Sequence, residues 1–125
     1  MKAMFKNCKN LKKVTLPYID HNKLQNLEEL FFNCISLTTV EYNTDTFNTI
    51  NVNSMQNMFR GCSSLVSIHF PNNFRTTNCA NIGDMFSGCK SLKSIDFNIF
   101  ETGNIENTSQ SDKSLITKRC LSVML

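Results

Sequence analysis

Apolar residues recur along this chain at a fixed set of positions, about every 27 residues. Cys8, Cys34, Cys62 and Cys89 mark the recurrence, because they lie 26, 28 and 27 residues apart. Each cysteine has three apolar positions before it and three after it at constant spacings. The four sets are Met1, Met4, Phe5, Cys8, Leu11, Val14 and Leu16; Leu27, Leu30, Phe31, Cys34, Leu37, Val40 and Tyr42; Met55, Met58, Phe59, Cys62, Leu65, Ile68 and Phe70; Ile82, Met85, Phe86, Cys89, Leu92, Ile95 and Phe97. This agreement predicts a protein built from stacked repeats.

A second block, with the pattern Phe-x-Thr-x-Asn, separates the repeats. It begins at Phe47, Phe74 and Phe100, and residues 19–24 fill the same place more loosely. The distance from the last apolar position to this block varies from three to five residues, whereas the other spacings are constant. Length variation confined to one place predicts a surface loop, which can grow without disturbing a stack.

The end of each seven-position set predicts a short β-strand. Residues 11–16, 37–42, 65–70 and 92–97 finish in an apolar–polar–apolar alternation that is rich in β-branched and aromatic residues. Equivalent strands one repeat apart pair in parallel, so we expect one continuous ladder along the stack.

The beginning of each set predicts one or two helical turns, since its apolar residues fall at positions i, i+3 and i+4. Asn7, Asn33, Gly61 and Gly88 then occupy the place of a helix C-cap, and they are residue types that tolerate left-handed backbone angles. Asn53, Ser54 and Asn81 stand where N-caps are expected. The predicted fold class is therefore α/β, with short helical turns on one side of the stack and parallel strands on the other.

The unit M-x-x-M-F-x-x-C-x-x-L-x-x-I-x-F, followed by F-x-T-x-N-V, resembles the BspA-like class of leucine-rich repeats. These repeats occur in surface proteins of bacteria and parasitic protists. The resemblance implies a right-handed, curved leucine-rich-repeat solenoid with its strands on the concave face and its helical turns on the convex side. It also implies a cell-surface location and adhesion to host proteins or other protein–protein contact, although no signal peptide or anchor is recognisable in the chain.

The repeats cover residues 1–105. Residues 106–125 lose the pattern and are predicted to be a degenerate fifth repeat that caps the stack, or a frayed tail. Met1 falls directly on an apolar position of the first repeat, without a polar cap before it. We therefore expect a fragment or a truncated gene product, with self-association through the open end as the alternative.

Composition and charge exclude several classes of function. The net charge of +3 is spread along the sequence, so no nucleic-acid-binding surface is indicated. No apolar stretch approaches the roughly 20 residues of a membrane span. The chain also lacks a glycine-rich phosphate loop and a cysteine–histidine pair at equivalent positions, so we expect no enzyme and no cofactor.

The cysteines are predicted to be free thiols in the core. Four of them share one repeat position, and Cys79 aligns with Val52 and Ile105, as a small buried hydrophobic residue would. A zinc site would need closely spaced cysteine pairs or cysteine–histidine clusters, which the sequence lacks.

The outward-facing strand positions are the candidate partner-binding surface. One row contains Thr15, Glu41, His69 and Asp96, and the flanking row contains Lys13, Thr39, Ser67 and Ser94. Equivalent residues on neighbouring strands lie roughly 4.8 Å apart, so each row is expected to be continuous. Three ligands in a straight row suit metal geometry poorly, so no metal site is predicted at Glu41, His69 and Asp96.

Two functions remain open. The first is a binding module that recognises a protein through the concave sheet, as in adhesion. The second is an intracellular structural or assembly protein that associates through the uncapped ends of its solenoid.

Overall fold

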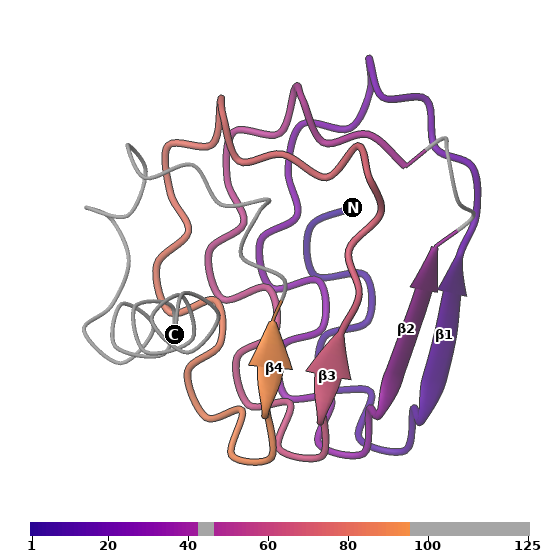
Figure 1. Cartoon of the computed structure of the whole chain (residues 1–125), viewed down its shortest axis with the longest axis vertical. Coiled ribbons are helices and arrows are strands. Elements are labelled where there is room, and N and C mark those ends of the chain that lie inside the picture. Colours follow the sequence, from indigo (N-terminus) through magenta and orange to yellow (C-terminus); the bar gives the residue numbers. More distant parts are fainter. Residues whose placement is uncertain (43–46, 96–125) are drawn as a thin grey trace, which may run out of the picture.

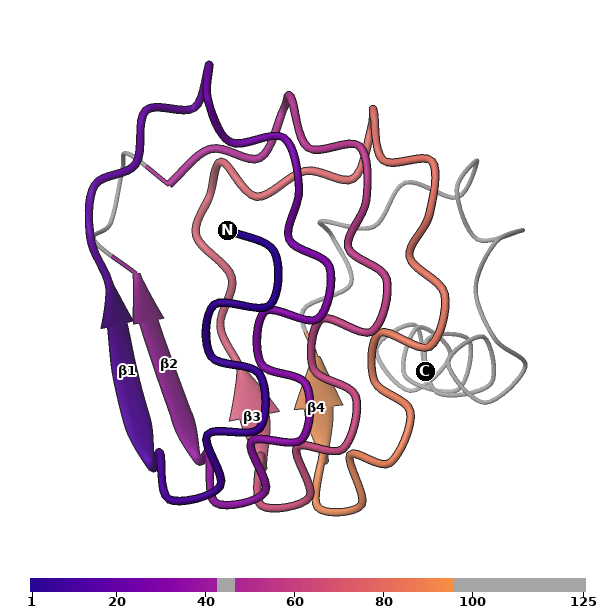
Figure 2. The same cartoon turned by 180° about the vertical axis from the view of Figure 1, so that it is seen from behind.

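The computed structural model describes residues 1–42 and 47–95. The chain passes four times through the same course, and we call these passes coils 1 to 4, after Cys8, Cys34, Cys62 and Cys89. The coils lie side by side in chain order (Figures 1 and 2). Asp96, the Phe-x-Thr-x-Asn block at Phe100 and the predicted terminal segment 106–125 lie outside the described residues.

Each coil contributes one short strand: β1 (Lys13–Leu16), β2 (Thr39–Tyr42), β3 (Ser67–Ile68) and β4 (Ser94–Ile95). β1 pairs in parallel with β2, and β3 pairs in parallel with β4, in the register expected from the repeat alignment. The two pairs form separate two-stranded sheets in the described part of the chain. The expected continuous ladder is therefore interrupted between β2 and β3.

The segments before the cysteines contain no helix in residues 1–42 and 47–95. They are runs of tight turns, and coil 3 shows how these turns are held. The N–H groups of Met58, Arg60 and Cys62 donate to carbonyl groups three residues earlier, as in β-turns. The N–H groups of Met55, Asn57, Phe59 and Gly61 instead donate to carbonyl groups of coil 4, at 2.8–3.0 Å. The predicted helical turns are thus replaced by turns that exchange hydrogen bonds between coils.

The backbone angles explain why a helix does not form there. Asn7, Asn33, Gly61 and Gly88 have positive φ angles of 62°, 57°, 78° and 76°, as their residue types predict. Four residues before each of them, however, a second residue also has positive φ, and the sequence gives no signal for it. These second residues are Ala3, Glu29, Asn57 and Asp84. A left-handed residue at every fourth position breaks the right-handed path of an α-helix.

The residues predicted as N-caps do not cap a helix, because no helix forms. Ser54 and Asn81, together with the equivalent Asn26, form parallel β-bridges along the stack, and the N–H group of Asn53 donates to the Gln25 carbonyl of the preceding coil. The side-chain oxygens of Asn26, Ser54 and Asn81 accept hydrogen bonds from the N–H groups two residues later, in Glu28, Gln56 and Gly83. Such side-chain turns begin the tight-turn segment instead of capping a helix.

The core lies between the tight turns and the strands. Phe5, Phe31, Phe59 and Phe86 stack ring on ring, with centroid distances of 5.4, 5.4 and 5.9 Å. Residues that the sequence alignment assigns to other apolar columns surround this stack, and many are fully buried. Examples are Leu27, Leu30, Leu37, Met55, Met58, Leu65 and Ile82. The described residues of the apolar columns therefore meet in a single cluster, except for Met4 and Cys8 of coil 1, which are exposed.

The cysteine column adds hydrogen bonds to this packing. Cys34, Cys62 and Cys89 each donate their S–H group to a phenylalanine carbonyl of the preceding coil, at Sγ–O distances of 3.0, 3.1 and 3.1 Å. The acceptors are Phe5, Phe31 and Phe59. The five cysteines in the described residues are free thiols, as predicted. Cys34, Cys62 and Cys79 are also buried as predicted, but Cys89 is only half-buried and Cys8 is exposed. Sequence reasoning treated this position as apolar packing and missed its role as a weak donor between coils.

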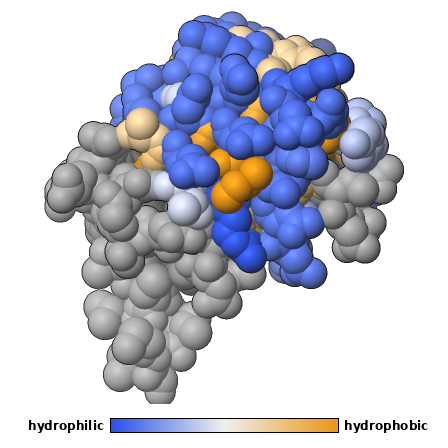
Figure 3. Space-filling view, turned by 90° about the horizontal axis from the view of Figure 1, so that it is seen from above, coloured by the Kyte–Doolittle hydropathy of each residue, from blue (hydrophilic) through white to orange (hydrophobic). Residues whose placement is uncertain are grey.

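The Phe-x-Thr-x-Asn blocks lie at the end of the molecule towards which the strands point. The buried Thr49 hydroxyl donates to the Arg75 carbonyl at 2.8 Å and accepts from the Arg75 N–H at 2.6 Å. Asn51 and Asn78 donate side-chain N–H groups to backbone carbonyls of the preceding coil. Seen from this end, the surface is mainly hydrophilic, with small apolar areas (Figure 3).

Candidate functional site

The predicted surface rows are formed on β1 and β2. Lys13 pairs with Thr39 and Thr15 pairs with Glu41, so the outward positions of the two strands are in register. All four side chains are exposed, whereas Leu16, on the opposite side of β1, is buried. This alternation follows from the two-residue period of a strand with one buried face.

Electrostatic contacts tie the two strands together on this face. Lys13 Nζ lies 2.7 Å from Glu41 Oε1, and the Thr15 hydroxyl donates to Glu41 Oε2 at 3.3 Å. The hydrogen bond from Lys13 holds the pKa of the Glu41 carboxyl below its ordinary value. The carboxylate is thus already neutralised by a lysine of its own chain.

The rows do not continue from β2 to β3 as the sequence predicted. Ser67 pairs with Ser94 across β3 and β4, but β2 and β3 belong to different sheets. His69 is exposed and follows the end of β3. Asp96, which was predicted to follow His69 in the same row, lies outside the described residues.

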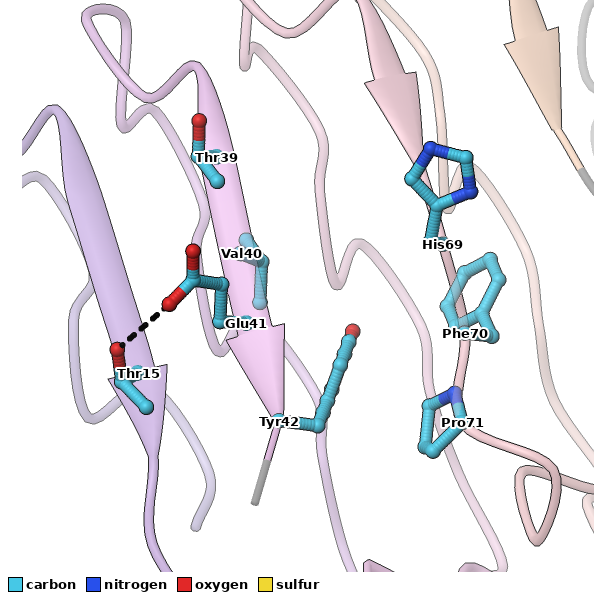
Figure 4. A pocket seen from close by; sticks show the side chains of 8 residues that line it. All are labelled: Thr15, Thr39, Val40, Glu41, Tyr42, His69, Phe70 and Pro71. Carbon is cyan, nitrogen blue, oxygen red and sulfur yellow. Dashed lines mark hydrogen bonds between the residues drawn. The ribbon is translucent and has the colours of Figure 1, made fainter. Parts of the chain in front are cut away.

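An open groove lies between β2 and the end of β3, where the expected strand pairing does not form. It has a volume of about 460 Å³ and is lined by Thr15, Thr39, Val40, Glu41, Tyr42, His69, Phe70 and Pro71. Figure 4 shows the side chain of Tyr42 reaching from β2 into the space that separates it from His69, Phe70 and Pro71. The groove therefore has apolar walls and a polar rim.

Tyr42 is the exceptional residue of this groove. Its hydroxyl is shielded from water and makes no hydrogen bond with any residue that the structure describes. Burial raises the pKa of the phenol well above its ordinary value, so it remains a protonated donor. Its ring packs against Phe47 at a centroid distance of 4.9 Å.

The groove brings together four of the eight residues predicted to bind a partner: Thr15, Thr39, Glu41 and His69. Lys13 joins them through its ion pair with Glu41. Sequence reasoning missed Val40, Tyr42 and Phe70, because their apolar columns were assigned to the core, and it gave no role to Pro71. The five-residue interval from Tyr42 to Phe47, the longest of its kind, was the one available signal for an irregularity here.

The groups needed for metal binding or thiol chemistry do not gather here. Within residues 1–42 and 47–95, no cluster of three or more His, Cys, Asp or Glu side chains is placed to hold a metal ion. Burial raises the pKa of Cys34 to about 11 and also raises the pKa of Cys62 and Cys79. These thiols are therefore held in the protonated form, which is a poor nucleophile.

Comparison with known proteins assigns the chain to a family. Residues 1–115 match the model of a family described as Mycoplasma proteins of unknown function, DUF285, and the chain belongs to this family. Searches of curated proteins and of solved structures returned no significant match. Among the described residues, no helix has the length and apolar character required to cross a membrane.

Proposed function

We propose that this chain is a leucine-rich-repeat solenoid of the BspA-like type, and that it binds a protein partner through the exposed face of its strands. Cell-surface adhesion is the setting we propose for this binding. The family to which the chain belongs is associated with BspA-like repeat proteins, which supports the proposal. Parallel strands one repeat apart and stacked aromatic residues are also the features that such repeats require.

One observation carries the binding proposal: exposed polar side chains of β1 and β2 stand in register beside a groove with apolar walls. Apolar pockets surrounded by polar groups are the usual sites for the anchor residues of a protein partner. The buried thiols have raised pKa values, which favours binding over thiol catalysis. We therefore propose no cofactor and no enzymatic activity.

Site-specific photo-cross-linking tests this proposal. A benzophenone amino acid replaces Thr15 on the strand face in one variant and Arg60 in a matched control. Both positions are exposed, but Arg60 lies in the tight turns on the other side of coil 3. After irradiation of intact cells that produce the protein, we expect the Thr15 variant to form a covalent adduct of defined mass with another protein, and the control to form none.

The same experiment separates adhesion from self-assembly. Adducts that consist only of two copies of this chain would support an assembly protein that associates through the ends of its solenoid. Adducts formed only at position 60 would place the interface on the tight turns and contradict binding through the strands.

A further inference from the structure

The turns that lead from the tight-turn segments into the strands form one edge of the molecule, which we call the lysine edge. They lie side by side at the end of the stack from which the strands start (Figures 1 and 2) and comprise residues 8–12, 34–38, 62–66 and 89–93. Three hydrogen bonds, of 2.9, 3.3 and 2.9 Å, join neighbouring turns: the Thr38 N–H to the Lys12 carbonyl, the Ser63 hydroxyl to the Ile35 carbonyl, and the Lys93 N–H to the Val66 carbonyl. The lysine edge is therefore continuous across all four coils, although the strands above it are not.

Positive charge occupies both ends of this edge. Lysine stands one and four residues after the cysteine in coil 1 and again in coil 4, as Lys9, Lys12, Lys90 and Lys93. All four are exposed, and none forms an ion pair with another residue that the structure describes. The four turns contain no aspartate or glutamate. The edge thus carries four uncompensated positive charges, whereas the net charge of the entire chain is only +3.

Apolar side chains occupy the middle of the same edge. Ile35 of coil 2 stands one residue after its cysteine, and Val66 of coil 3 stands four residues after its own. Ile35 is 44% exposed and Val66 is 43% exposed, whereas no other isoleucine, valine or leucine in the described part of the chain is exposed. The repeat register therefore places two protruding apolar side chains between lysines that are distant in the sequence.

The residue types on this edge favour a lipid surface over a protein or a nucleic acid. Protein interfaces are enriched in aromatic residues, methionine and arginine and depleted in lysine and serine, and the four turns show the opposite composition. Nucleic-acid sites use arginine forks or stacked aromatic rings, which these turns also lack. An anionic bilayer requires neither, because it attracts lysine as a point charge and receives protruding aliphatic side chains without a pocket.

We propose that the lysine edge docks the chain on an anionic lipid bilayer, with the lysine ammonium groups close to the lipid phosphates and with Ile35 and Val66 inserted between the headgroups. The strands start at this edge and run away from it (Figure 1), so the strand face stays clear of the lipid. This attachment uses other residues than the proposed protein-binding face and does not depend on it.

Co-sedimentation with vesicles measures this attachment. We expect the wild type to bind vesicles of equal parts phosphatidylglycerol and phosphatidylcholine, to bind less as added salt screens the charges, and not to bind pure phosphatidylcholine. Lys12→Gln combined with Lys93→Gln should lower the partition coefficient roughly tenfold to thirtyfold, because each lysine near an anionic surface contributes about fivefold. Lys2→Gln combined with Lys23→Gln is the matched control: it removes the same charge from exposed positions outside the edge and should change the coefficient less than about threefold.

A single tryptophan reports on insertion, because the sequence contains none. Val66→Trp places it on the lysine edge. The control is Tyr18→Trp, since Tyr18 is 61% exposed and lies beyond the opposite end of β1. Brominated lipid in the mixed vesicles should quench the fluorescence of Val66→Trp and leave that of Tyr18→Trp unchanged. Circular dichroism checks that each variant folds, and the lysine variants still decide the question if Val66→Trp does not fold.

Three results would overturn the proposal: equal binding to neutral and anionic vesicles, equal losses in the two lysine pairs, or equal quenching of the two tryptophans. A benzophenone amino acid in place of Val66 distinguishes an acidic protein partner. An adduct with a protein on intact cells, and none with lipid, would assign the edge to that partner and also overturn the proposal. The adduct at position 15 tests protein binding through the strands separately.

Discussion

The tight-turn side and the strand side of this molecule differ in how completely backbone hydrogen bonds join neighbouring coils. On the tight-turn side, coils 1, 2 and 3 each donate hydrogen bonds to the coil that follows, from Ala3 in coil 1 to Gly61 in coil 3. On the strand side, pairing joins coils 1 and 2 and then coils 3 and 4, and a groove separates the two pairs. The comparison indicates that the tight turns hold the stack together, which leaves the strand side free to open.

The largest expected effect comes from truncating a phenylalanine on each side of coil 3. Phe59 is fully buried between the rings of Phe31 and Phe86, and Phe59→Ala should lower the free energy of unfolding by about 3–5 kcal/mol. Phe70→Ala should cost at least about 1 kcal/mol less, because it enlarges a groove that is already open instead of creating a sealed cavity. Urea unfolding of both variants measures the difference, and equal losses would contradict the contrast between the two sides.

An intermediate effect is expected at the glycines of the tight turns. Gly61 has a φ of 78°, and a Cβ atom there would overlap Asn33 Oδ1 of the preceding coil. Gly61→Ala should therefore cost about 2–4 kcal/mol, from the left-handed conformation and the overlap together. Gly88→Ala has a similar φ, but its nearest neighbours are atoms of Gly61 at 3.4 Å, so about 1–2 kcal/mol is expected.

The double variant Asn33→Gly, Gly61→Ala separates these two costs. Removal of the Asn33 side chain should restore the stability of Gly61→Ala to the level of Gly88→Ala, measured by thermal unfolding. If the double variant stays as unstable as Gly61→Ala, close contact between the coils is not the source of the loss.

The smallest expected effect is a gain in stability, and it comes from a substitution on the strand side. Tyr42→Phe removes a buried hydroxyl that has no hydrogen-bond partner among the described residues, so the variant should be more stable by about 1 kcal/mol. Tyr18→Phe is the control. Because Tyr18 is 61% exposed, this substitution should change the free energy of unfolding by less than about 0.5 kcal/mol. A clear loss of stability in Tyr42→Phe would instead mean that the hydroxyl already has a hydrogen-bond partner.

Much of the packing could be read from the sequence, because each repeat places the same residue type in the same column. The phenylalanine stack, the positive φ of Gly61 and Gly88 and the pairing of Thr15 with Glu41 all follow from the repeat alignment. The candidate surface was predictable only in part. Its exposed residues followed from strand alternation, but the groove depends on a pairing that fails at one of the equivalent positions.

The helical turns show why a pattern alone was insufficient. Apolar residues at i, i+3 and i+4 fit one face of a helix, and they fit equally well a run of tight turns with one buried side. Whether a helix or a run of tight turns forms depends on which carbonyl groups accept hydrogen bonds from the N–H groups of the segment. A neighbouring coil offers carbonyl groups at the correct spacing, and Asn57, Phe59 and Gly61 use them instead of forming a helix.

The sequence by itself determined the repeat, its register, the columns that fill the core and the outward rows of β1 and β2, because each is a property of residue type at a fixed spacing. Only the tertiary structure decided that the turns bond between coils, that the cysteine thiols donate to phenylalanine carbonyls, and that β2 and β3 stay apart. These features depend on which groups of neighbouring coils come within hydrogen-bonding distance. The positions of groups contributed by different coils are fixed only when the whole stack forms.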